Sequence, residues 1–183
     1  MKSKPELQFE QEVIEYLTKI GGTKQWEYRH DIKTTKELWD NFKHILEKNN
    51  HDRLKGEKLS KMEFAQVKKV ITEIDTPYKA GQFLYGVNGV SQAEVDLDNG
   101  EHVILTVFDQ AKVGGGDTVY QIVNQIKRPK VVDGKPNRRF DVTLLINGLP
   151  IIQIELKKAL HSTTESLNQM KQYVAEKQYS GIY

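Results

Sequence analysis

The sequence contains no cysteine, and this absence excludes disulfide bridges and thiolate metal sites. No stretch approaches the roughly 18 consecutive apolar residues of a membrane-spanning helix, so we expect no membrane partner. The first residues, MKSKPELQFEQEV, are too polar to be typical of a secretory signal. A chain without cysteine suits a reducing compartment, and the location that we predict is cytoplasmic.

The chain also lacks a strong overall charge, because its net charge is only +2 over 183 residues. Charge is nevertheless concentrated in one segment, residues 127–158, where basic side chains outnumber acids. The basic residues are Lys127, Arg128, Lys130, Lys135, Arg138, Arg139, Lys157 and Lys158, and the acids are Asp133, Asp141 and Glu155. Basic residues around a few isolated acids are expected where a polyanion meets a metal. On charge alone, a solvated basic loop is the simpler interpretation.

The first third of the chain has the apolar periodicity of helices. The first helix carries Phe9, Val13, Leu17 and Ile20 on one face and should end at Gly21-Gly22. Thr34 and Glu37 form a capping box that opens a second helix, with Leu38, Phe42, Ile45 and Leu46 inward. Ser60 and Glu63 open a third, with Phe64, Val67, Ile71 and Ile74 inward, and Pro77 should close it.

From about residue 83 the pattern changes to strands, among them HVILTVFD (102–109), VYQIVNQI (119–126) and the segment 139–158. We expect these strands to form one meander. A last helix, opened by Ser162 and Glu165 and carrying Leu167, Met170 and Val174, should pack on the sheet. The fold class is therefore α+β (mixed α/β). We expect one domain over 1–183, with a mainly helical portion (1–80) and a sheet core (81–183).

The hairpin within residues 139–158 has two possible registers. Asn147-Gly148 is a strong two-residue turn signal, but that turn alone would place Asp141 on the apolar face with Ile152 and Ile154. A buried carboxylate without a partner costs several kcal/mol. A three-residue loop, or an equivalent bulge, places Val142, Leu144, Ile152, Ile154 and Leu156 on the core face. Asp141, Glu155 and Lys157 then share the other face, and this is the register that we predict.

Two carboxylates and a lysine on one sheet face suit metal-dependent phosphodiester cleavage. Oxygen ligands suit Mg²⁺, which binds through one or two carboxylates plus a substrate phosphate and keeps several waters. Such an ion polarises the phosphoryl oxygen and activates a bound water. Lys157 would orient that water or neutralise the charge of the transition state.

These residues resemble a known nuclease family. Asp141 followed by Glu155-Leu156-Lys157 matches the PD-(D/E)xK signature, and Gln169-x-x-x-Tyr173 follows on the next helix. Together, the segment NRRFDVTLLINGLPIIQIELK and this helix look like the N-terminal nuclease region of the restriction (motor) subunit of type I restriction–modification enzymes. The resemblance is strongest over 119–183 and looser over 6–22, and the middle of the chain is not diagnostic. Phe140 departs from the pattern, since it occupies the usual proline position.

The resemblance implies a restriction-endonuclease-like core, a central mixed sheet flanked by helices, and a role for each matching residue. It implies metal binding by Asp141, Glu155 and the Leu156 carbonyl, completed by an acid of the first helix, for which Glu10 is our candidate and Glu12 the alternative. Lys157 would be catalytic, with Gln169 and Tyr173 supporting the site. We also expect DNA contacts from Arg138, Arg139, Lys158, Gln169 and Tyr173.

The activity implied is that of a type I site-specific deoxyribonuclease subunit that cleaves double-stranded DNA with Mg²⁺, for which Mn²⁺ can substitute. Its partners would be the modification and specificity subunits. ATP would be used only by motor domains that are not in this sequence, so the chain resembles a fragment of a longer protein.

Simpler interpretations exist for each residue and for the whole. Asp141 could pair with Arg138 or Arg139, Glu155 and Lys157 could be an exposed ladder pair, and Gln169 and Tyr173 could be ordinary helix surface. The alternative functions are a non-cleaving DNA-binding or docking module of the same fold, and a repair or junction nuclease.

Overall fold

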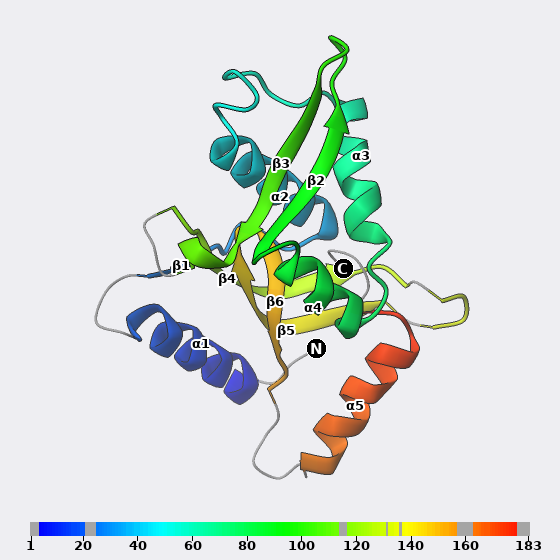
Figure 1. Ribbon diagram of the computed structural model, residues 1–183. Coiled ribbons are helices and arrows are strands. Elements are labelled where there is room, and N and C mark those ends of the chain that lie inside the picture. The colour runs from blue at the N-terminus through cyan, green and yellow to red at the C-terminus, as the bar shows by residue number, and fades with distance from the viewer. Residues whose placement is uncertain are drawn as a thin grey trace. The chain divides into compact units, whose positions relative to one another are not determined.

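The structure is a computed structural model that describes residues 4–20, 25–113, 117–130, 132–135, 137–156 and 163–178. Its elements are α1 (Lys4–Lys19), β1 (Trp26–Tyr28), α2 (Thr35–Asn49), α3 (Lys61–Thr72), α4 (Pro77–Tyr85), β2 (Val90–Asp96), β3 (His102–Asp109), the 3-10 helix η1 (Gln110–Lys112), β4 (Tyr120–Arg128), β5 (Arg138–Ile146), β6 (Leu149–Ile154) and α5 (Thr163–Ala175) (Figure 1). The predicted α+β class is confirmed. Within the described part of the chain, no helix is long and apolar enough to cross a membrane.

The chain divides into two compact units that interleave along the sequence. Unit 1 contains the described residues up to Leu38 together with Val119–Gln178, and unit 2 contains Trp39–Thr118. The boundary near residue 118 separates β3 from β4, which pair with different strands. The expectation of a single meander is therefore wrong. Strand β3 instead pairs with β2 inside unit 2.

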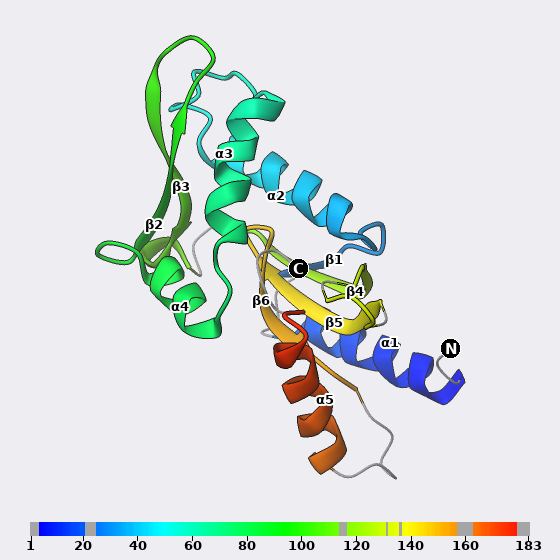
Figure 2. The same cartoon turned by 90° about the vertical axis from the view of Figure 1, so that its right-hand side faces the viewer.

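Unit 1 is built on a four-stranded sheet in the order β1-β4-β5-β6. β1 runs parallel to β4, while β4–β5 and β5–β6 are antiparallel, so the predicted central mixed sheet is confirmed. Helix α1 covers part of the sheet (Figure 2), and its Ile14 packs against Ile122, Val142 and Leu144. Each of these aliphatic side chains, when fully buried, stabilises the folded state by about 1.5–3 kcal/mol.

The inward face of α1 differs in part from the predicted one, although Leu17 packs against the core as expected. Phe9 is 47% exposed and Ile20 is 43% exposed, whereas Glu10 and Ile14 are buried. The helix is rotated in this way because Glu10 finds two amide donors on β4, Asn124 Nδ2 at 2.7 Å and Gln125 Nε2 at 2.5 Å. A buried carboxylate with such partners is tolerated, and apolar periodicity alone cannot reveal them.

Unit 2 packs α2 and α3 around an aromatic cluster, with the β2–β3 hairpin alongside α3. Both predicted capping boxes are present: Thr34 accepts from the Glu37 amide at 3.3 Å, and Ser60 accepts from the Glu63 amide at 3.2 Å. Edge-to-face contacts at 6.1 Å join Trp39 to Phe42 and Phe64. Burial alternates along β2, where Ser91, Ala93 and Val95 are buried. These local patterns agree with the sequence.

Pro77 was expected only to close the third helix, which in fact ends at Thr72. Pro77 instead occupies the first turn of α4, whose cap is Thr76, accepting from the Lys79 amide at 3.2 Å. Proline suits this position because its missing N–H would have no helical partner there. The sequence prediction therefore missed a helix.

Candidate active site

The β5–β6 hairpin has a two-residue turn and a compensating bulge. Asn147 and Gly148 have φ angles of 51° and 80°, and Ile146 pairs with Leu149 across them. The predicted three-residue loop is therefore wrong, but the alternative, an equivalent bulge, is present. The register shifts next to Leu144 and Leu145, because Leu145 pairs with Pro150 while Leu144 pairs with Ile152. The extra residue on β6 changes which face each later side chain occupies.

The bulge separates the acids from the core. Val142 and Leu144 pack toward α1 together with Ile154 and Leu156, as expected. Ile152 was expected in the core but is 47% exposed on the edge strand β6. Beyond the bulge, Thr143 pairs with Gln153, and the Thr143 hydroxyl donates to Gln153 Oε1 at 2.7 Å. Alternation then puts Asp141 and Glu155 on the face of this polar pair.

The two carboxylates are held by different kinds of donor. Asp141 is 6% exposed, and its Oδ2 accepts from the backbone N–H of Leu156 at 2.9 Å. Glu155 Oε1 accepts from Gln153 Nε2 at 3.1 Å, and Glu155 Oε2 accepts from Gln169 Nε2 at 3.0 Å. The backbone that follows β6 therefore lies beside Asp141.

Helix α5 presents Gln169 and Tyr173 to the acids. Besides Glu155, Gln169 Nε2 also donates to the Tyr173 hydroxyl at 2.7 Å. Tyr173 is 5% exposed, and its ring contacts Phe140 edge to face at 5.8 Å. Burial, and next the Glu155 charge, raise the pKa of Tyr173, so its hydroxyl remains neutral at physiological pH. The simpler interpretation, that Tyr173 is an ordinary surface residue of the helix, is therefore wrong.

The apolar residues of α5 do not form its buried face. Leu167 is 51% exposed and Val174 is 54% exposed, whereas Tyr173, Glu176 and Gln178 are buried. Packing on the sheet was expected through Leu167, Met170 and Val174, and for Leu167 and Val174 this is wrong. Tyr173 and Glu176 are buried because unit 1 supplies them with partners, Gln169 and Arg138. The predicted cap Ser162, like Lys157 and Lys158, lies outside the described residues.

Arg138 has an internal partner. Its Nε and Nη2 donate to the two oxygens of Glu176 at 2.8 and 2.6 Å, and its guanidinium lies 5.1 Å from the Tyr173 ring centre. Arg139, the next residue, is exposed. Within the described part of the chain neither arginine forms an ion pair with Asp141. Sequence reasoning missed Glu176, although its position three residues after Tyr173 is a usable signal.

The Arg138–Glu176 pair yields a prediction of stability. Arg138→Ala leaves a buried carboxylate without its cation, so we expect the free energy of unfolding to fall by about 2–4 kcal/mol. Arg139→Ala is the matched control, with an expected change within about 0.5 kcal/mol because its side chain is exposed. Urea unfolding of the variants measures both values. Equal losses would contradict a structural role for the pair.

The same pair gives stability a pH dependence. Arg138 holds the pKa of Glu176 below its ordinary value. A carboxyl whose folded pKa is lowered contributes stability that is present above its unfolded pKa and lost as pH falls through the folded pKa. The free energy of unfolding should therefore fall less steeply with decreasing pH in the Arg138→Ala variant than in the unchanged chain.

Glu10 does not join the two acids as a third member of a metal-binding group. It is 2% exposed and bound to Asn124 and Gln125, and Gln125 has a φ of 56°, which is unusual for a residue with a side chain. Glu12 is exposed and accepts from Gln8 at 3.1 Å. In the part of the chain that the structure describes, no three acids or histidines are arranged to hold a metal ion.

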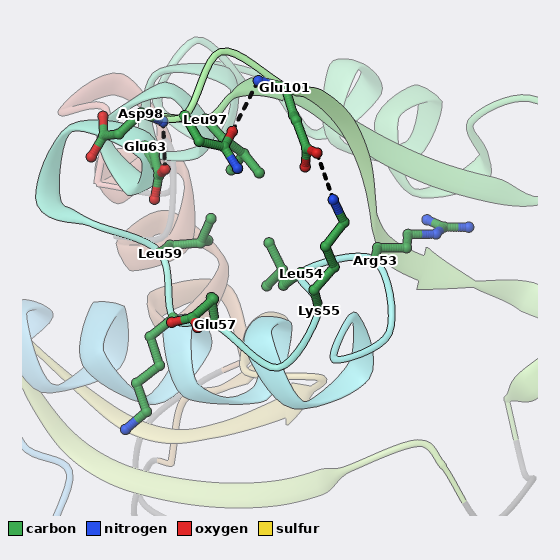
Figure 3. Close-up of a pocket in the computed structure, with 11 residues that line it drawn as sticks. Arg53, Leu54, Lys55, Glu57, Leu59, Glu63, Leu97, Asp98 and Glu101 are labelled. Atoms are coloured by element: carbon green, nitrogen blue, oxygen red, sulfur yellow. Dashed lines mark hydrogen bonds and ion pairs between the residues drawn. The ribbon is translucent and has the colours of Figure 1, made fainter.

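Unit 2 contains a pocket and a histidine cluster of its own. The pocket has a volume of about 200 Å³, and some of the charged residues that line it are bound to one another or to the backbone (Figure 3). Glu63 accepts from the amides of Ser60 and Asp98 at 2.6 and 2.8 Å, and Lys55 pairs with Glu101 at 2.5 Å. These contacts join the loop after α2 and the first turn of α3 to the tip of the β2–β3 hairpin, so their role is structural.

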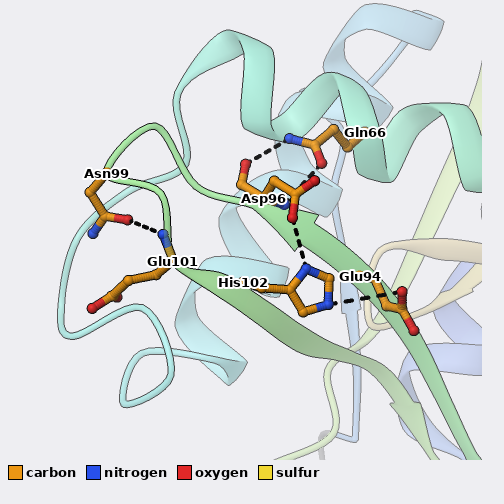
Figure 4. Close-up of polar contacts among 6 residues, drawn as sticks. All are labelled: Gln66, Glu94, Asp96, Asn99, Glu101 and His102. Carbon is orange, nitrogen blue, oxygen red and sulfur yellow. Dashed lines mark hydrogen bonds and ion pairs between the residues drawn. The ribbon is translucent and has the colours of Figure 1, made fainter.

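The cluster of one histidine and two acids lies on the β2–β3 hairpin. His102 Nδ1 lies 2.8 Å from Asp96, and Glu94 is 3.9 Å from the other ring nitrogen (Figure 4). Asp96 raises the pKa of His102, as expected for a histidine beside a carboxylate. All three side chains are exposed, and the pairing contributes little to stability.

Comparison with known proteins identifies the family of the chain as a whole. The profile of the family described as type I restriction enzyme R protein N terminus matches residues 4–182. The chain belongs to this family. The resemblance predicted from the motifs is therefore confirmed, and the match to the R protein N terminus also includes the middle of the chain, where we found no diagnostic motif.

Relatives of this R protein N terminus are named as endonuclease subunits. A type I restriction enzyme endonuclease subunit of Staphylococcus aureus strain MSSA476 is 30% identical over 185 residues, covering 100% of this chain and 18% of the relative. One from Staphylococcus saprophyticus is 31% identical over 154 residues, covering 83% and 15%. The EcoprrI endonuclease subunit of Escherichia coli is 41% identical over 56 residues, covering 31% and 17%. The chain thus spans less than a fifth of the length of these relatives.

Proposed function

We propose that this chain is the endonuclease domain of a type I restriction enzyme R subunit and that it hydrolyses phosphodiester bonds of double-stranded DNA. The observation that carries the proposal is the bonded chain Tyr173–Gln169–Glu155, on the face that Asp141 shares. It joins the two parts of the motif, the acids and the Gln-x-x-x-Tyr helix. Membership of the R protein N-terminal family supports the same conclusion.

The residues present fit a hard divalent cation. Asp141, Glu155 and the carbonyl of Leu156 supply oxygen donors, and the Leu156 backbone lies beside Asp141. Mg²⁺ binds through one or two carboxylates and retains several waters, so a third acid such as Glu10 is not required. When bound, such an ion polarises a phosphoryl oxygen and lowers the pKa of water.

The chain's own residues would act by position and charge. Gln169 fixes one Glu155 oxygen, and the Leu156 N–H fixes one Asp141 oxygen, so neither carboxylate needs to reorganise. Tyr173 keeps a neutral hydroxyl beside them. We assign to Lys157, which follows Leu156 in the sequence, the neutralisation of charge on the phosphate in the transition state.

Membership of the family is the ground on which we propose the partners and the further domains of the enzyme. Modification and specificity subunits would choose the target, and ATP would be used by motor domains of the longer R subunit. The alternative of a non-cleaving module is disfavoured by the presence of both acids, because a docking surface has no need of two hard oxygen ligands on one face.

Metal removal tests the proposal. In the complex assembled with the partner subunits, we expect plasmid cleavage with Mg²⁺ or Mn²⁺, none in EDTA, and little with Ca²⁺, whose looser coordination positions a water poorly. Binding of Mn²⁺ to the 183-residue chain, followed by calorimetry, gives a readout independent of cleavage. Undiminished cutting in EDTA would remove the metal mechanism. Metal binding without any cutting would favour the docking module.

A further inference from the structure

The β4–β5 pairing brings four basic residues into a two-by-two arrangement. Lys127 pairs directly with Arg139, and Arg128 pairs directly with Arg138. Directly opposite residues of antiparallel strands project to the same face, with Cβ atoms about 5 Å apart. Each face therefore carries one pair of like charges, which is unfavourable unless an anion lies close to it.

The basic side chains on the two faces differ in whether they have partners within unit 1. Arg128 and Arg138 lie on the face where Arg138 is bound to Glu176 and Arg128 Nη2 donates to the Lys177 carbonyl at 3.4 Å. Lys127 and Arg139 lie on the other face, and both are exposed. Among the described residues no acid forms an ion pair with Lys127 or Arg139. Unit 1 thus pairs Arg138 with an acid and Arg128 with a backbone carbonyl, and it leaves Lys127 and Arg139 facing solvent.

The exposed pair shares its face with the acids of the candidate site. Side chains alternate along β5, so Arg139 projects to the same face as Asp141, two residues on. Burial follows this alternation at the start of the strand, where Arg139 is exposed and Phe140 is buried. The pair therefore lies at one end of the strand that carries Asp141, on the face to which Asp141 projects.

We propose that Lys127 and Arg139 together bind a phosphate of the DNA backbone and so seat the strand beside Asp141. The inference rests on the proposed function and adds a residue, Lys127, that the motif does not contain. It also separates Arg139 from Arg138, whose guanidinium is engaged by Glu176. Arginine offers a planar fork to phosphate oxygens and lysine a point charge, so the two suit one shared anion.

Direct binding of DNA to the 183-residue chain tests this pair. A labelled duplex is titrated in EDTA, so that cleavage plays no part, over a series of salt concentrations. Lys127→Gln and Arg139→Gln should each weaken binding about tenfold at low salt. The double variant should also reduce the slope of log K against log salt by about 0.9, because the one phosphate contact that the pair makes is lost. The loss should be equal for duplexes of different sequence, since phosphates carry no sequence information.

Lys19→Gln is the matched control, because it removes one exposed positive charge from the end of α1. Its salt slope should equal that of the unchanged chain. The thermal unfolding midpoint should stay the same or rise in Lys127→Gln and Arg139→Gln, because each substitution relieves a like-charge contact. A lowered midpoint in both variants would assign them a structural role and overturn the proposal.

The remaining outcomes separate this inference from the proposed function. If the double variant binds like the unchanged chain, or if Lys19→Gln weakens binding equally, the phosphate pair is overturned while metal-dependent cleavage by the complex stands. If the unchanged chain fails to bind duplex even at low salt, the pair is likewise overturned. If binding depends on the pair but the complex never cuts, the pair is supported and the nuclease assignment fails.

Discussion

Asp141→Asn in the assembled enzyme is expected to reduce DNA cleavage by at least about 10³-fold, because loss of the proposed metal ligand removes several kcal/mol of transition-state stabilisation. The substitution is nearly isosteric, and the asparagine oxygen can still accept from the Leu156 N–H, as Asp141 Oδ2 does. The fold should therefore survive. What is lost is the negative charge and, with it, affinity for a hard cation.

Glu155→Gln should reduce cleavage to a similar extent, with one difference. Glu155 accepts from Gln153 with one oxygen and from Gln169 with the other. A glutamine can accept through one atom only, so its amide nitrogen must oppose one of these donors. We expect Glu155→Gln to disturb Gln169 as well, and the unfolding midpoint of this variant to fall slightly more than that of Asp141→Asn.

Controls for the two acids come from the same unit. Asp133→Asn and Glu15→Gln make the same chemical changes at exposed side chains. Both should cut plasmid DNA at the rate of the unchanged complex, with quench-flow or gel assays as the measurement. ATP hydrolysis, which we propose for motor domains of the longer R subunit, should persist in all four variants. Simultaneous loss of cleavage, ATP hydrolysis and solubility in Asp141→Asn would show that the acid is structural.

The second large effect concerns Gln169, which acts on the acids through hydrogen bonds. Gln169→Ala is expected to reduce cleavage about 10–100-fold, the usual effect of losing a residue that orients a metal ligand. Its amide is the donor that joins Glu155 to the Tyr173 hydroxyl. Without it, Glu155 Oε2 loses that donor, and the Mg²⁺ concentration for half-maximal cleavage should rise.

Tyr173→Phe separates the hydroxyl from the ring. Phenylalanine keeps the contacts with Phe140 and Arg138 but cannot accept from Gln169. We expect a smaller loss of cleavage than for Gln169→Ala, with nearly unchanged stability. Tyr173→Ala should instead destabilise unit 1 by about 3–5 kcal/mol, because it leaves a cavity against Phe140.

Asn168→Ala is the control for this helix, since Asn168 is the exposed neighbour of Gln169 on α5. It should cut at the unchanged rate. The decisive pattern is a loss of cleavage in Gln169→Ala without a change in the unfolding midpoint. Wild-type cutting by both Gln169→Ala and Tyr173→Phe would remove the support that α5 gives to the nuclease proposal.

Several features of this protein are determined by residues close together in the sequence. The capping boxes Thr34–Glu37 and Ser60–Glu63 formed as predicted because each needs only two hydrogen bonds within one helical turn. The Asn147-Gly148 turn formed because both residues adopt positive φ more readily than most. The family could be inferred for a similar reason, since the spacing of its motif is a property of the chain itself.

The tertiary structure decided which faces these elements bury and which strands they join. β3 and β4 are adjacent in sequence and similar in composition, yet they belong to different sheets. Glu10 is buried and Phe9 exposed because amides distant in sequence satisfy the carboxylate. The bulge that puts Asp141 and Glu155 on one face, and the pairing of Lys127 with Arg139, likewise depend on strand register. Register and burial are set by non-local contacts, whereas a linear pattern records only the period of the side chains.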